Sequence, residues 1–159
     1  MKPKGKRIAE KTWLDDQEKG QRLAVLLIRE IDRIVFDLDF RRELLFQLWS
    51  RDRVRQPLLR AVSSRFYDIE AELLILFPPD VIQKLDDFYR ALDEFIFYMS
   101  YTEDMPQNMA QKFDAYLDEI KTMAPALVEQ LAALVPDYEV ELAAFEPPTP
   151  DLTTVTAEE

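Results

Sequence analysis

Two aspartates, Asp37 and Asp39, follow an apolar run and are the first candidates for catalysis in the sequence. At the end of a strand, such a pair can act as nucleophile and general acid in phosphate-ester hydrolysis. That chemistry needs a tight turn directly after the pair, whereas Phe40 and two arginines follow here, and the helical spacing of apolar residues continues through Asp37. We therefore expect no catalytic pair, with Asp37 on the surface and Asp39 as the cap of the next helix.

The acidic residues between 80 and 119 and the pair Ser63 and Ser64 are the other candidates for metal binding or catalysis. Metal sites in helical bundles combine inward-facing glutamates with Glu-x-x-His motifs, and this chain has no histidine. No histidine or lysine lies in register to activate either serine hydroxyl. We expect no metal, no cofactor and no enzymatic activity. The acids are expected to be solvated residues beside an apolar stripe: Asp86, Asp87, Asp93, Glu94, Asp114, Asp118 and Glu119.

Arginines gather between residues 41 and 65, around a polar segment that ends at Pro57. Guanidinium groups pair bidentately with carboxylates and phosphates. One interpretation, which we favour, is that these arginines are counter-charges for the acids of the later helices. The other is a binding site for an acidic partner or a phosphate, with Arg51, Arg53, Arg55 and Arg60 as its candidate residues. The cluster comprises Arg41, Arg42, Arg51, Arg53, Arg55, Arg60 and Arg65.

Aromatic residues form the second candidate binding surface. Residues 95–99 are apolar all round a predicted helix, so that helix is either central in the bundle or presents a spare face to another subunit. Phe97, Tyr98 and Tyr101 are the candidate contact residues at its end, because aromatic residues and arginine supply much of the energy of protein interfaces. Phe46 and Trp49 are also candidates for exposure.

Composition excludes several classes of function. The chain has 159 residues, enough for one domain with a sizeable core. It has no cysteine and no histidine, and its only glycines are Gly5 and Gly20, so disulfides, thiolate or imidazole ligands and glycine-rich phosphate loops are excluded. Residues 1–60 carry a net charge of +5 and residues 61–159 one of −16. This acidic surface argues against nucleic acid as a partner.

The apolar runs are too short for a membrane span. The run from Leu23 to Ile28 has six residues, and a span needs about 20. The basic start of the chain is not followed by the long apolar stretch of a secretory signal. We therefore expect a cytoplasmic protein without a membrane span.

Apolar periodicity predicts the elements that must position these residues. Proline-rich or polar segments separate the stretches, and no segment alternates long enough for a strand. The expected fold is all-α, an up-and-down antiparallel bundle of about five helices. It forms a single domain over 12–145, between a disordered basic tail at 1–11 and a disordered acidic tail rich in Pro and Thr at 146–159. The predicted helices cover residues 14–38, 41–50, 57–76, 81–100 and 106–123, with a restart at Pro125 that continues to 135.

The function predicted from these residues is a non-catalytic interaction or adaptor module that binds a protein partner or itself, a homodimer being one candidate assembly. The alternative is a regulator that binds nucleic acid or another polyanion through the arginine cluster and the basic N-terminal segment.

Overall fold

The computed structural model describes residues 4–102 and 106–136, and side chains within 15–102 and 107–136. Every regular element in these residues is helical, which confirms the all-α prediction. The long helices are α1 (Lys4–Phe40), α5 (Pro79–Tyr101) and α6 (Pro106–Ala133). The short elements between α1 and α5 are α2 (Arg42–Ser50), α3 (Gln56–Ala61), the 3-10 turn η1 (Phe66–Asp68) and α4 (Ala71–Leu74).

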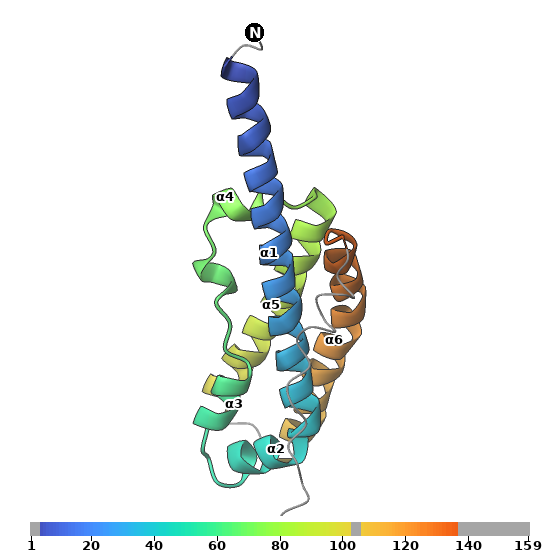
Figure 1. The fold of residues 1–159 in the computed structure, drawn as a ribbon. Coiled ribbons are helices and arrows are strands. Elements are labelled where there is room, and N and C mark those ends of the chain that lie inside the picture. The colour runs from blue at the N-terminus through green and yellow to red at the C-terminus, as the bar shows by residue number, and fades with distance from the viewer. Residues whose placement is uncertain (1–3, 103–105, 137–159) are drawn as a thin grey trace, which may run out of the picture.

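The chain passes along the bundle in four segments (Figure 1). α1 and α5 run in the same direction, α6 runs back, and the segment from α2 to α4 returns the chain from the end of α1 to the start of α5. α6 packs against both α1 and α5. The N-terminal part of α1 extends beyond the other helices. Consecutive segments alternate in direction. The second segment, residues 42–74, consists of short helices and turns, and we call it the strap.

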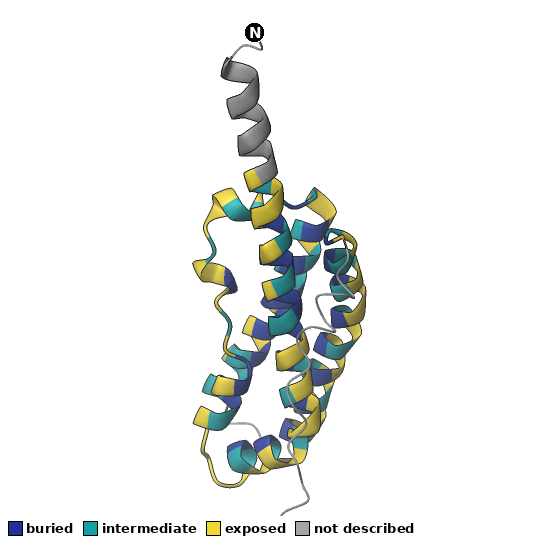
Figure 2. Ribbon diagram, in the orientation of Figure 1, coloured by how far each residue is buried: buried dark blue, intermediate teal, exposed yellow. Residues whose placement is uncertain are grey.

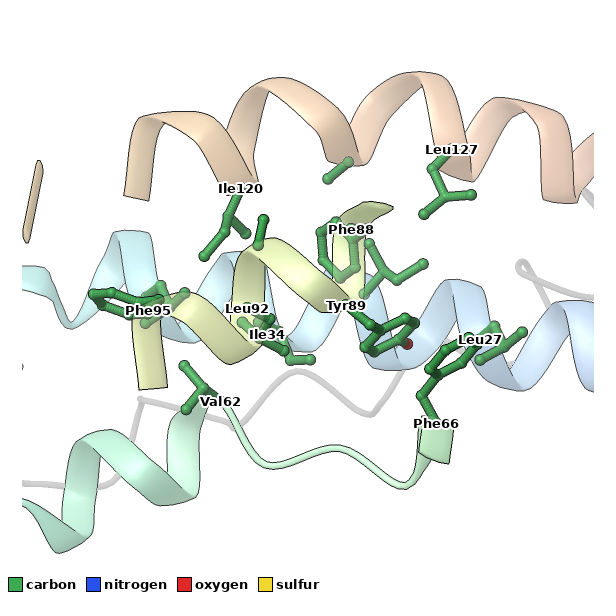
Figure 3. Packing of buried hydrophobic residues seen from close by; sticks show 14 of the residues in the cluster. Leu27, Ile34, Val62, Phe66, Phe88, Tyr89, Leu92, Phe95, Ile120 and Leu127 are labelled. Atoms are coloured by element: carbon green, nitrogen blue, oxygen red, sulfur yellow. The ribbon is translucent and has the colours of Figure 1, made fainter. Parts of the chain in front are cut away.

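The apolar faces of α1, α5 and α6 form one core, which the strap closes on its open side (Figure 3). Ile34 comes from α1, Phe88 and Phe95 from α5, and Ile120 from α6, and all four are fully buried. Val62 and Phe66 approach the same core from the strap. Exposed residues cover the outward faces of the helices (Figure 2). Among the described residues, no helix has a stretch apolar and long enough to cross a membrane.

The single helix expected over 57–76 is wrong. α3 ends at Ala61, and side chains then bind the backbone where helical bonds would continue: Ser63 Oγ donates to the carbonyl of Arg60 at 2.9 Å, and Ser64 Oγ accepts from the amide of Phe66 at 2.9 Å. Serine side chains compete with helical hydrogen bonding in this way. The apolar spacing that suggested a helix is satisfied instead by a strap whose side chains still reach the core.

Three helix boundaries also differ from expectation. α1 begins at Lys4, so it takes in most of the segment 1–11, where we expected no regular structure; lysine and arginine are good helix formers. α6 continues through Pro125 rather than restarting there. Asp39 lies within α1 and caps no helix, because α2 begins after Arg41 without a side-chain cap. The predicted tail 146–159 and the domain limit at 145 lie outside the described residues.

Replacing Gly20 by alanine is expected to stabilise the protein by about 0.5–1 kcal/mol, since glycine is a poor residue in a helix interior. Gly20 lies in α1 against Leu76, and an added Cβ would meet the Leu76 Cβ at 3.5 Å, an ordinary contact. Urea unfolding followed by circular dichroism measures the change. Gly20→Leu is the control, because its longer side chain must displace Leu76 and should destabilise. A less stable Gly20→Ala variant would contradict the packing at this position.

Candidate interaction site

The C-terminal end of α5 is held by α2 and by the segment after it. Trp49 Nε1 donates to the carbonyl of Met99 at 3.0 Å, and Arg55 Nη1 donates to the carbonyl of Ser100. The amide of Thr102 binds the carbonyl of Tyr98 at 2.9 Å. These bonds supply donors to carbonyls that have no helical hydrogen-bond partner at the end of a helix. The positive charge of Arg55 also interacts favourably with the negative end of the helix dipole. The arginine cluster thus meets the aromatic end of α5 through Arg55.

An open hollow of about 910 Å³ lies between this end of α5 and the first turns of α6, and we call it the α5–α6 groove. Phe97 and Tyr101 stand beside each other in it, with ring centroids 4.9 Å apart, and they are 67% and 73% exposed. Exposed acids, Asp93 and Glu94, lie along the same groove. The lining residues are Asp93, Glu94, Ile96, Phe97, Tyr98, Ser100, Tyr101, Thr102, Lys112 and Tyr116.

Tyr98 differs from the other two predicted contact residues because it is half-buried and forms part of the groove wall. Its ring packs against Trp49 and Tyr116, with centroids 5.9 and 5.5 Å away. Lys112 Nζ lies 5.2 Å from the centre of the Tyr98 ring, a cation–π distance. The expectation that Trp49 is exposed is wrong: its side chain is 1% exposed. Phe46 is half-buried.

Arg42 has the counter-charge role that we favoured for the cluster. Its Nε and Nη2 donate to the two carboxylate oxygens of Asp114 on α6, at 2.7 and 2.6 Å. Hydrogen bonding to Asp114 is the main cause that raises the pKa of Arg42. A second bridge joins α6 to α1 with the charges reversed: Lys121 Nζ on α6 binds Asp39 Oδ1 on α1 at 2.6 Å.

Other arginines of the cluster have no such role. Arg51, Arg53, Arg60 and Arg65 are exposed, and none forms an ion pair within the part of the chain whose side chains are described. Arg53 has a φ of 56° in the segment that closes the end of α2. Four positive charges between the end of α2 and the start of η1 therefore face solvent and are available to an anionic group.

The two aspartates considered first do not converge. Asp37 lies between Arg33 and Arg41, at 3.7 and 3.8 Å, whereas Asp39 pairs with Lys121. Among the described residues, no three acidic side chains cluster closely enough to hold a metal ion.

Sequence reasoning missed a polar network between α1, the strap and α5. The Tyr89 hydroxyl donates to Glu30 Oε1 at 2.9 Å, and Ser64 Oγ donates to the same oxygen. Burial, followed by the negative charge of Glu30, raises the pKa of Tyr89. The Phe66 ring stacks on Tyr89 with centroids 4.1 Å apart. Ser64 is thereby used to hold the strap against the bundle.

No protein-family model matches this sequence, and comparison with curated proteins and with solved structures gave no match. A proposal for the function therefore rests on the geometry of the α5–α6 groove and on the exposed arginines described above.

The Arg42–Asp114 pair is expected to show a coupling energy of about 0.5–1 kcal/mol in a double-mutant cycle with alanine at both positions. Because the pair is bidentate and partly buried, its coupling energy should exceed that of a fully exposed pair. Urea unfolding of the four proteins gives the coupling, which should fall as salt is raised. The matched control is Arg22–Glu18, an exposed pair within α1, with an expected coupling of about 0.3 kcal/mol. Equal couplings in the two pairs would contradict a special role for Arg42.

Proposed function

We propose that this protein is a non-catalytic interaction module and that its partner binds in the α5–α6 groove. The observation that carries the proposal is the exposure of two adjacent aromatic side chains, Phe97 and Tyr101, inside an open hollow. Large aromatic side chains lose little conformational entropy on binding and dominate many interfaces. The cytoplasmic location expected from the sequence stays a prediction.

The groove favours a partner segment that carries both an apolar and a basic side chain. Phe97 and Tyr101 offer contact area for the apolar side chain, and Asp93 and Glu94 offer carboxylates for the basic one. The acidic charge of residues 61–159 adds a long-range attraction for such a segment. Arg55 is bound to Ser100 and acts by positioning the end of α5, whereas Arg53, two residues before it, is exposed and is the candidate charge contact.

The test compares groove variants in a quantitative affinity purification followed by a binding titration with the purified partner. Phe97→Ala and Tyr101→Ala are each expected to weaken binding by about 30-fold, which corresponds to about 2 kcal/mol for a central aromatic contact. Phe40→Ala is the matched control, because Phe40 is 76% exposed on α1 and lies outside the groove. A partner that binds all three variants equally would overturn the groove as the site.

Self-association through the same groove is measured by light scattering during size-exclusion chromatography. If the partner is a second copy, wild type has twice the monomer mass, the dimer persists at high salt, and Phe97→Glu restores the monomer. A dimer that Phe97→Glu leaves intact uses another surface. A monomeric wild type excludes the second copy as the partner under those conditions.

The second candidate function, binding of a polyanion, is favoured by the four exposed arginines without ion pairs among the described side chains. Binding through phosphate contacts weakens steeply with salt, whereas an apolar interface persists. Arg51→Gln combined with Arg53→Gln should lower both the affinity for a single-stranded oligonucleotide and the salt dependence. An oligonucleotide affinity that neither salt nor this double variant changes would exclude the candidate.

A further inference from the structure

A second hollow, of about 430 Å³, lies where α1, α2 and α3 meet, and we call it the arginine pocket. Arg33 reaches it from α1, Arg41 from the junction of α1 and α2, and Arg60 from α3. Asp37 is the one carboxylate among its described lining residues. The arginine pocket shares no lining residue with the α5–α6 groove.

The guanidinium of Arg33 is held in place by the strap. Its Nη2 donates to the carbonyl of Ser63 at 2.7 Å and its Nη1 to the carbonyl of Ala61 at 3.3 Å. These neutral acceptors orient the side chain without cancelling its charge. Because α3 ends at Ala61, the chain leaves the helix at this point, and its backbone carbonyls can accept hydrogen bonds from a side chain of α1.

The positive charge of the pocket exceeds its negative charge. Asp37 lies 3.7 Å from Arg33 and 3.8 Å from Arg41, too far for a hydrogen bond and near enough to offset one charge. Arg60 has no ion pair among the described side chains. The described lining thus holds three guanidinium groups and one carboxylate, and an anion that enters offsets the excess of positive charge.

An apolar wall stands beside these charges. Leu44 is 55% exposed, and Leu48 and Pro57 are half-buried along the same hollow. An inorganic anion would bind to the guanidinium groups and leave this apolar wall in contact with water. A ligand with an apolar body would cover both.

We infer that the arginine pocket binds an amphiphilic organic anion, a carboxylate or a phosphate carried on an apolar body. The planar guanidinium groups bind either head group through paired hydrogen bonds. The leucine and proline side chains take the body. This site is independent of the partner bound in the α5–α6 groove, so failure of one proposal leaves the other standing.

The ligand class is tested with probes that share one chain and differ in head group: octanoate, octyl phosphate and octanol, with acetate as the probe that lacks the chain. Calorimetry on the full chain gives the affinities, and nuclear magnetic resonance of the arginine Nε–H groups gives the position. Octanoate or octyl phosphate should bind at least about tenfold more tightly than octanol and acetate, the factor that one charge-assisted hydrogen bond supplies. The tighter of the two anions identifies the head group. Octanol binding as tightly as both anions, or acetate as tightly as octanoate, would overturn the proposal.

Variants then place the probe. Arg41→Gln and Arg60→Gln are each expected to weaken the tighter anion by about tenfold or more, through loss of a charge-assisted contact. Arg51→Gln is the matched control: it removes the same charge from the same cluster, and Arg51 does not line the pocket. Circular dichroism verifies that the variants stay folded, which their exposed positions favour. Equal weakening by Arg51→Gln would show that net charge alone attracts the anion and would refute the site.

Discussion

Replacing Trp49 by alanine is expected to lower the free energy of unfolding by about 3–5 kcal/mol, the range for deletion of a large buried aromatic side chain. Trp49 contacts the rings of Phe46, Tyr98 and Phe113, with centroids 6.0, 5.9 and 5.8 Å away. It therefore joins α2 to both α5 and α6. Urea unfolding followed by circular dichroism measures the loss. Phe40→Ala is the control, since an exposed side chain should change stability by about 0.5 kcal/mol or less.

Trp49→Phe separates the hydrogen bond of Trp49 from its packing. Phenylalanine keeps most of the aromatic contacts and removes the Nε1 donor, which leaves the buried carbonyl of Met99 without that partner. The expected loss is about 1–3 kcal/mol, the range for an unsatisfied buried polar group. Since Met99 lies at the end of α5 beside the groove, the variant should also weaken binding at Phe97 and Tyr101. If Trp49→Ala were as stable as Phe40→Ala, α2 would not be packed as described.

The sequence predicted α5 and the first part of α6 closely because their signals are local. The stripe from Val81 to Met99 has helical spacing throughout, and prolines at 78, 79 and 106 mark the helix starts. Pro125 did not mark a helix start, because α6 continues through it. Packing of α6 against α1 and α5 outweighs the hydrogen bond that a proline removes.

The strap could not be predicted from periodicity. Its apolar residues repeat as in a helix, but the chain is held by Ser63, Ser64 and Arg33 through bonds to backbone carbonyls and amides. Arg33 lies 30 positions before the Ser63 carbonyl that it binds. Such a contact has no local pattern in the sequence, and it explains why Arg33 was not among the predicted arginines although it completes the pocket.

The burial of Trp49 and the particular partner of Arg42 could not be predicted, for the same reason. Spacing identifies which side of a helix is apolar, but it does not identify the element that packs against that side. Trp49 meets Met99 across 50 positions and Arg42 meets Asp114 across 72. The exposure of Phe97 and Tyr101 was foreseeable because a helix that is apolar all round exceeds what its neighbours can cover.

Raising the pH above about 10 is expected to destabilise the protein through its tyrosines. Burial is the main cause that raises the pKa of Tyr89 well above its usual value, and burial with a hydrogen bond to Asp93 raises the pKa of Tyr67 to about 12. The folded protein therefore keeps these protons at a pH where the unfolded chain loses them. The contribution of Tyr89 to stability is complete below the ordinary tyrosine pKa of about 10 and falls above it by up to about 1.4 kcal/mol per pH unit. The contribution of Tyr67 is smaller, because its side chain is 60% exposed and solvent screens its charge.

Tyr89→Phe isolates the larger of these two effects. At about pH 8 the variant should be less stable than wild type by about 1 kcal/mol, because the hydrogen bond to Glu30 is lost. Its stability should then fall less steeply with pH, so that the difference shrinks or reverses by about pH 12. Tyr101→Phe, which removes an exposed hydroxyl, should keep the wild-type slope. Urea unfolding at a series of pH values decides the matter. If Tyr89→Phe kept the wild-type slope, the alkaline loss would come from other groups, and the Glu30–Tyr89–Ser64 network would not hold the strap in the way its geometry indicates.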